Sequence, residues 1–146
     1  MATTEKEERT RVKLDAFRDA ISNPAASCPV SESLHHLFLV WADRFTVWHL
    51  RILAFFDDPK VWFTNRGRQF PFSMMGSLSQ LLVAAFPELQ NQRAFTDLIA
   101  KDLWTAGLLS TDGLHTVMTA SGTEGSRTTD IGKQFLRFVT ESKPTK

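Results

Sequence analysis

Hydrophobic residues recur at helical spacing along most of the chain, and this pattern predicts a mainly α-helical protein. The segment over residues 47–56 is apolar on nearly all sides, so we expect it to form the central, buried helix. The other helices are predicted over residues 4–22, 31–44, 58–67, 78–86 and 91–106, with a last one opening at Thr128-Thr129-Asp130.

Residues suited to helix termini stand at several of these boundaries. Thr46 precedes the apolar helix as an N-cap. Asp58 before Pro59 is typical of an N-cap followed by proline at the first helical position. Ser77 with Gln80 three positions later is a capping-box pair, which predicts a helix start at residue 78.

The helix over residues 91–106 carries most of the functional argument. Gly107 follows its last apolar position, which predicts a C-cap glycine with positive φ. We expect Leu53, Phe55 and Phe135 to share one core with this helix. Its inward residues are predicted to be Phe95, Leu98, Ile99, Leu103 and Ala106. Its outward residues are predicted to be Arg93, Asp97, Ala100, Lys101 and Trp104.

Two short strands are predicted after this helix, over residues 108–110 and 114–119. Glycines bracket the loop at 120–125, which we interpret as the tip of a wing. Residues 126–128 are expected to pair back across that loop. Helix, β-hairpin and helix in this order are the layout of a winged helix.

The fold class predicted is therefore mainly α with a small β-hairpin, a winged helix-turn-helix preceded by two N-terminal helices. We expect residues 1–45 to form a helical extension that packs on or extends the core. Residues 46–142 are expected to form the winged-helix-like domain, and residues 143–146 a tail.

Composition fits one folded domain in a reducing compartment. The 146 residues are 42% hydrophobic and include 12 Phe and 4 Trp, enough for one good core. No apolar run approaches the roughly 20 residues that span a bilayer, and the charged N-terminus does not resemble a signal peptide. A single cysteine, Cys28, excludes an internal disulfide. Because the chain also lacks a long apolar run and a signal peptide, we expect a cytoplasmic location and no membrane partner.

Two segments carry a family resemblance. Residues 38–63 and 114–138 resemble a group of uncharacterised bacterial proteins in which a variable helical region precedes a C-terminal winged-helix-like module. The similarity covers most of the chain after about Lys13. Residues 128–139, TTDIGKQFLRFV, also resemble the closing helix of winged-helix regulators. The resemblance implies the fold and supplies no catalytic motif.

Enzymatic chemistry is the least favoured class. His35 and His36 are neighbours on a helix and point in different directions, so they cannot share one ion. His49 and His115 have no ligands at metal-binding spacing. Neither a nucleophile elbow nor a phosphate-binding loop is present. We expect a non-enzymatic protein with no cofactor and no metal.

Binding of duplex DNA is the function that the predicted fold favours, by analogy at the level of the fold. At the start of the helix over residues 91–106, polar side chains would face base edges: Gln90, Asn91, Gln92 and Arg93. Lys101 lies on the same predicted outward face, and three arginines would hold phosphates: Arg127, Arg66 and Arg68. The net charge of +1 adds no strong electrostatic footprint.

A protein-interaction or assembly module is the alternative. Trp104 on an otherwise polar stripe is expected to be covered by another element or a second subunit. The first helix carries an apolar stripe of Leu14, Phe17 and Ile21, which suits a homodimer. In this alternative the winged helix is a scaffold and binds no nucleic acid.

Overall fold

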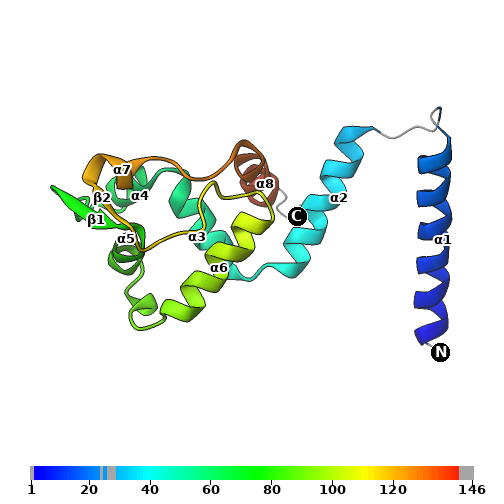
Figure 1. The fold of residues 1–146 in the computed structure, drawn as a ribbon, viewed down its shortest axis with the longest axis horizontal. Coiled ribbons are helices and arrows are strands. Elements are labelled where there is room, and N and C mark those ends of the chain that lie inside the picture. Colours follow the sequence, from blue (N-terminus) through cyan, green and yellow to red (C-terminus); the bar gives the residue numbers. More distant parts are fainter. Residues whose placement is uncertain (1, 24, 26–28, 142–146) are drawn as a thin grey trace. The chain divides into compact units, whose positions relative to one another are not determined.

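A computed structural model describes residues 2–23, 25 and 29–141 of the chain (Figure 1). The chain divides into two compact units, Met1–Val40 and Trp41–Lys146, and each is described by itself. Most described residues are helical, which confirms the mainly α class. Cys28 and the predicted tail at residues 143–146 lie outside the described residues.

The first unit holds α1 (Ala2–Ser22) and most of α2 (Val30–Arg44). The predicted helices at 4–22 and 31–44 are both present, each starting one or two residues earlier than expected. Every described side chain of α1 from Thr4 onward is exposed. Phe38 of α2 is buried.

The second unit is built around α3 (Val47–Asp57), as its all-round apolar sequence predicts. α3 contacts α4 (Pro59–Asn65), α6 (Arg93–Thr105) and α8 (Asp130–Glu141) (Figure 1). The most deeply buried side chains of α3 are Ile52, Leu53, Phe55 and Phe56, each fully inaccessible to solvent.

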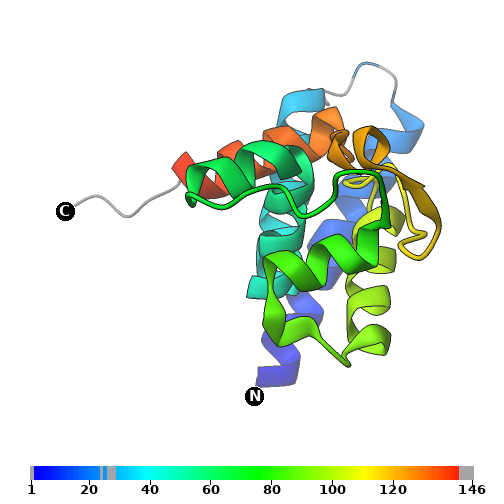
Figure 2. The ribbon, with the colours of Figure 1, turned by 90° about the vertical axis from the view of Figure 1, so that its left-hand side faces the viewer.

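The predicted helix caps are present. The Asp58 carboxylate accepts a hydrogen bond from the Val61 amide at 3.2 Å, at the start of α4. Ser77 and Gln80 form the capping box of α5 (Leu78–Ala85), with each side chain accepting the other residue's amide at 3.0 and 3.2 Å. The 3-10 helix η1 (Pro87–Leu89) then leads towards α6 (Figure 2).

The small sheet differs from the predicted hairpin. β1 (Met75–Ser77) pairs antiparallel with β2 (Val117–Thr119), in the register Met75↔Thr119. The sheet therefore joins the segment before α5 to the segment after α6. A three-residue strand is too short to show alternation, which is why β1 was not predicted.

The predicted wing loop at residues 120–125 is wrong, because this segment forms the short helix α7 (Ala120–Glu124). The Thr119 hydroxyl caps it by accepting the Gly122 amide at 3.1 Å. The glycines therefore stand inside and just after a capped helical turn. The pairing expected of residues 126–128 is present as one antiparallel bridge, Leu109↔Thr128.

α6 is rotated about its axis relative to the predicted phase. Leu98 is 57% exposed, so its placement in the core was wrong, whereas Ala100 is fully buried rather than outward. Thr96 is also buried, and its hydroxyl donates to the Gln92 carbonyl at 3.0 Å, which satisfies its polar group. Ile99 and Leu103 are in the core, as predicted.

The C-terminus of α6 closes as predicted. Gly107 has φ +82°. Its amide donates to the Trp104 carbonyl, and the Leu108 amide donates to the Leu103 carbonyl, both at 2.9 Å. This pair of bonds is the Schellman motif, and it carries the chain away from α6 towards the loop that follows.

Candidate functional site

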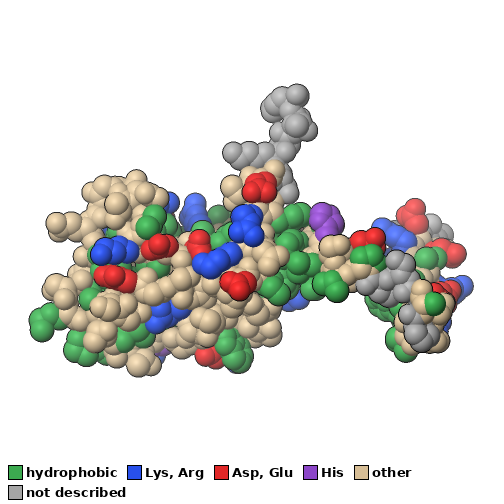
Figure 3. All heavy atoms as spheres, turned by 90° about the horizontal axis from the view of Figure 1, so that it is seen from above, with side chains coloured by type: hydrophobic (Ala, Val, Ile, Leu, Met, Phe, Trp, Pro, Cys, Tyr) green, Lys and Arg blue, Asp and Glu red, His purple; other side chains and the backbone are tan. Residues whose placement is uncertain are grey.

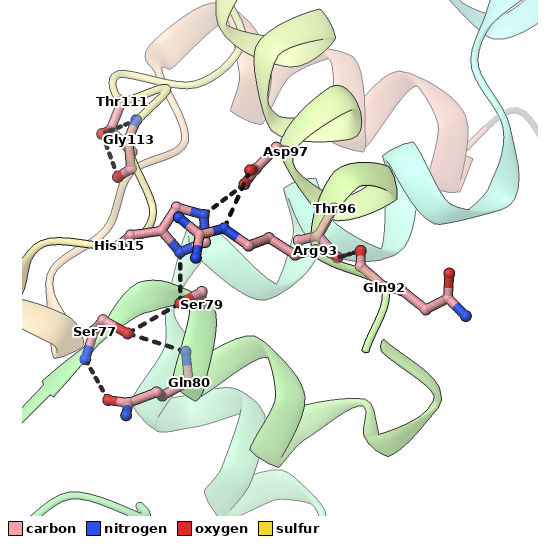
Figure 4. A network of polar contacts seen from close by, with 10 residues as sticks. All are labelled: Ser77, Ser79, Gln80, Gln92, Arg93, Thr96, Asp97, Thr111, Gly113 and His115. Carbon is pink, nitrogen blue, oxygen red and sulfur yellow. Dashed lines mark hydrogen bonds and ion pairs between the residues drawn. The ribbon is translucent and has the colours of Figure 1, made fainter. Parts of the chain in front are cut away.

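A cavity of about 320 Å³ lies where α5, the start of α6 and the loop before β2 meet (Figure 4). Most of the residues that line it are polar. The lining residues are Ser79, Gln80, Val83, Leu89, Asn91, Arg93, Thr96 and His115.

Local structure fixes the position of Ser79 in the first turn of α5. The Ser79 amide donates to the Leu114 carbonyl at 2.8 Å, which ties α5 to the loop that carries His115. Leu114 is 1% exposed and anchors that loop in the core. Ser79 and His115 are therefore held together by backbone structure on both sides.

A series of hydrogen bonds and one ion pair links α5, the loop before β2 and α6 beside this cavity (Figure 4). The Ser79 Oγ lies 3.1 Å from His115 Nδ1, and His115 Nε2 lies 2.8 Å from Asp97 Oδ1. Arg93 Nε lies 3.8 Å from the other carboxylate oxygen of Asp97. The Ser79 hydroxyl is also 3.0 Å from the Ser77 hydroxyl.

The carboxylate determines which imidazole nitrogen carries the proton. An ionised Asp97 can only accept, so a neutral His115 donates its Nε2–H to it. Nδ1 then has a free lone pair and accepts the Ser79 hydroxyl proton. Serine, imidazole and carboxylate thus form a connected series, the arrangement that activates a hydroxyl nucleophile.

Sequence reasoning missed this series. His115 lies 36 positions from Ser79 and 18 from Asp97, so no local motif joins them. From the sequence, His115 has no ligands at metal-binding spacing and is expected to be a structural histidine. Their proximity depends on the path of the loop between α6 and β2, which is joined to α5 through the Leu114 carbonyl and to α6 through His115.

Four of the residues predicted to contact DNA do lie together. Gln90, Asn91 and Gln92 are exposed in the turn between η1 and α6, and Arg93 is exposed at the first residue of α6. Asn91 has φ 65°, which asparagine tolerates better than most residues. Lys101 is exposed about two turns further along α6.

The three arginines predicted to hold phosphates are engaged elsewhere. The central carbon of the Arg66 guanidinium lies 4.0 Å from the centre of the Trp62 ring, and the guanidinium donates a hydrogen bond to the Trp62 carbonyl. Arg68 donates to the carbonyls of Ala84 and Ala85 at the end of α5. These two guanidiniums stabilise their own loop and a helix C-terminus.

Arg127 is not beside a wing, because α7 occupies that segment. Its guanidinium donates to the Gly125 carbonyl at 2.8 Å and lies 3.4 Å from the Met118 sulfur. Burial lowers the pKa of Arg127 by disfavouring the charged form. This side chain is half-buried against α7 and β2, which does not suit a phosphate contact.

A second hollow, of about 460 Å³, runs between the last turn of α2 and α6; we call it the α2–α6 groove. Trp41, Phe45 and Leu98 supply its apolar surface. The polar residues that line it are Arg44, Lys101, Asp102 and Thr105, and Ala106 completes the wall.

Asp102 is held from the core side of the α2–α6 groove. His49 is buried in α3, and its Nε2 lies 2.9 Å from Asp102 Oδ2. The Thr46 amide donates to His49 Nδ1 at 3.0 Å, so neutral His49 donates its Nε2–H to Asp102. His49 is thus a structural link between α3 and α6.

The residues proposed for an interface are all exposed. The exposed fraction is 46% for Trp104, 45% for Leu14, 51% for Phe17 and 84% for Ile21. Coverage of Trp104 by a second subunit stays a prediction. The homodimer through α1 also stays a prediction.

Comparison with protein-family models finds no matching family, and comparisons with curated proteins and with solved structures find no significant match. The resemblance to a bacterial group stays a prediction. Within the described ranges, no helix is long and apolar enough to cross a membrane. No group of three His, Cys, Asp or Glu in that part of the chain could hold a metal ion.

Proposed function

We propose that the chain is a protein-interaction module whose α2–α6 groove binds an amphipathic acidic segment of another protein. The observation that carries this proposal is an apolar surface of Trp41, Phe45 and Leu98 beside two cations, Arg44 and Lys101. Aromatic and aliphatic side chains that line a concave surface are typical anchors for a partner's side chains.

Leu98 is an exposed apolar side chain that a binding partner could cover. It is 57% exposed on a helix whose opposite face is packed in the core. A lone exposed leucine needs no explanation, but this one adjoins two aromatic rings in the same groove. A partner side chain placed there would bury all three groups together.

The charge around the α2–α6 groove favours an acidic occupant. Asp102 is the acidic residue in the wall, and it is bonded to His49. Arg44 and Lys101 then leave the groove with an excess of positive charge. Glutamate or aspartate on a partner would complement them, and complementary charges of this kind favour encounter and register.

A pair of synthetic helices tests this function. One presents leucines flanked by glutamates over about 20 residues, long enough for an isolated helix to form. The other replaces each glutamate by lysine. In isothermal titration calorimetry, we expect the acidic helix to bind and the basic one to bind at least about tenfold more weakly, a difference of roughly 1.4 kcal/mol.

Two matched variants locate the binding. Leu98→Glu should abolish binding of the acidic helix, because it places a charge in the apolar surface of the groove. Val61→Glu changes another exposed apolar residue, on α4, and should leave binding intact. Equal binding of both helices, or equal loss in both variants, would contradict the proposal.

Duplex DNA is a second candidate, supported by the four exposed polar residues at the start of α6. α5 and α6 follow each other as the two helices of a helix-turn-helix do, and β1 and β2 flank them as in a winged-helix topology. Against it, Asp97 Oδ2 lies 3.8 Å from Arg93 Nε on the same helix, where its negative charge would repel phosphate. Elsewhere on the surface, on the face seen in Figure 3, Lys and Arg side chains also lie among Asp and Glu.

Fluorescence anisotropy with random duplex DNA across a salt series separates the two candidates. DNA binding through α6 predicts that Arg93→Ala weakens binding far more than Arg127→Ala, since Arg127 is engaged with Gly125. Asp97→Asn should strengthen it by removing a negative charge that would face phosphate. Absence of binding at low salt in all these variants leaves the protein-interaction module.

A further inference from the structure

We propose that Ser79 is a nucleophile activated by His115, and that the cavity between α5 and α6 accepts a short-chain carboxylic ester. This inference rests on the cavity between α5 and α6 and not on the α2–α6 groove, so it is independent of the function proposed above. Figure 4 shows four of the side chains that carry it, those of Ser79, His115, Asp97 and Arg93.

The geometry meets the first requirement for such a nucleophile. The hydroxyl lies within hydrogen-bond reach of its base, at 3.1 Å, and the base is oriented by a carboxylate at 2.8 Å. Asp97 selects the tautomer in which Nδ1 accepts the serine proton. Asp97 is therefore a positioning residue, while Ser79 and His115 would contact the reacting atoms.

The cavity suits a small acyl donor. Its volume of about 320 Å³ is at the low end for ligand pockets. Val83 and Leu89 provide an apolar wall for a short acyl chain, and Arg93 and Asn91 bring N–H donors to the same space.

Side chains rather than backbone amides must stabilise the developing oxyanion. The amides of Ser79 and Gln80, in the first turn of α5, are already bonded to the Leu114 carbonyl and the Ser77 hydroxyl. We therefore assign that role to the Arg93 guanidinium and the Asn91 amide. This differs from sites that use a pair of backbone amides.

The reaction balances without any further reagent. The Ser79 Oγ bonds to the ester carbonyl carbon as its proton passes to His115 Nδ1. The bond from that carbon to the alcohol oxygen then breaks, and His115 returns the proton to the leaving alcohol. Water repeats the sequence on the acyl-serine, releasing the carboxylic acid and restoring the hydroxyl.

A fluorophosphonate probe tests the nucleophile directly. Attack by Ser79 forms a phosphorus–oxygen bond and expels fluoride, and the labelled residue is identified by mass spectrometry of peptides. We expect Ser79 to be labelled and exposed Ser110, the matched control serine, to remain unlabelled. Ser79→Ala should remove the label, while Ser110→Ala should not.

The role of His115 is read from rates. His115→Gln should slow labelling of Ser79 by about 100-fold, the lower end of what a general base contributes. In the unaltered chain, the rate should rise with pH as the imidazole loses its proton. Asp97→Asn should slow labelling and displace that pH profile, which a purely structural role would not do.

Hydrolysis of p-nitrophenyl acetate tests the reaction on an ester substrate. If the acyl-serine accumulates, we expect a burst of p-nitrophenol equal in concentration to the chain.

Labelling of Ser79 no faster than Ser110 would overturn the proposal. A flat pH profile in the unaltered chain would also overturn it, and that test holds even if His115→Gln fails to fold. In either case the hydrogen bonds serve to fasten the loop before β2.

Discussion

Gly132 in α8 lies against the backbone of another segment. A Cβ at this position would lie 2.5 Å from the Leu108 carbonyl oxygen and 2.7 Å from Thr128 Cγ2. Both neighbours are buried and held by hydrogen bonds, so neither can move aside easily. The absence of a side chain is what allows α8 to pack here.

Gly132→Ala should therefore destabilise the fold, although alanine favours helices by up to about 1 kcal/mol over glycine. We expect a net loss of about 1–3 kcal/mol in the free energy of unfolding, as for other overpacked sites. Urea denaturation measures it. The control is Gly113→Ala, where a Cβ meets nothing within 4 Å. Equal stability of the two variants would show that α8 can shift at no cost.

His49 and His115 have different roles in the structure, and residue type alone does not distinguish them. His49 is buried and links α3 to α6, while His115 sits at an open cavity. Both stand in the sequence without ligands at metal-binding spacing. Their roles depend on Asp102 and Asp97, which lie 53 and 18 positions away and are brought near only by the tertiary fold.

At the scale of elements, the sequence predicts helices and their ends far better than strands. Caps at Asp58, Ser77 and Gly107 are local interactions between residues a few positions apart, so their pattern is visible in the sequence. β1 and β2 pair across more than 35 intervening residues and are three residues long. Nothing local distinguishes such a pairing from the predicted hairpin.

The phase of α6 shows a different limit. The most apolar choice of inward face places Leu98 in the core, but the structure buries Thr96 and Ala100 instead. Thr96 can be buried because its hydroxyl bonds to the backbone of the same helix. A small buried residue such as Ala100 lets neighbouring segments approach closely. A prediction from hydrophobicity alone places leucine inside, because it takes no account of the Thr96 hydrogen bond or of the close packing that Ala100 allows.

Ala100→Leu tests this phase. The three carbon atoms that leucine adds would not fit a fully buried site, and we expect a loss of about 1–3 kcal/mol in the free energy of unfolding. Ala94→Leu is the control on the exposed face of α6 and should change stability by less than about 0.5 kcal/mol. The originally predicted phase, with Ala100 outward, requires Ala100→Leu to be tolerated.

At the scale of the molecule, the two units differ in how much they bury. The second unit holds seventeen of the eighteen buried hydrophobic residues among those described, and the first holds Phe38. Every described side chain of α1 from Thr4 onward is exposed. We infer that α1 contributes little to the stability of the rest.

A chain that begins at residue 30 should therefore unfold with nearly the same free energy as the full chain, within about 0.5 kcal/mol. It keeps α2 with Phe38 and removes α1. Urea denaturation followed by tryptophan fluorescence is suitable, because all four tryptophans are retained. A loss of several kcal/mol would mean that the apolar stripe of Leu14, Phe17 and Ile21 packs against another surface.

The central claim is that the α2–α6 groove binds an acidic amphipathic segment. Titration of the ¹⁵N-labelled chain with the acidic Leu/Glu helix, followed by NMR, tests it most directly. We predict shifts in the Trp41 indole N–H and in the amides around Leu98 and Lys101. The Trp62 indole, which lies under Arg66, should not move. Shifts confined to residues 90–93, or no shift at Trp41 at saturating peptide, would contradict the claim.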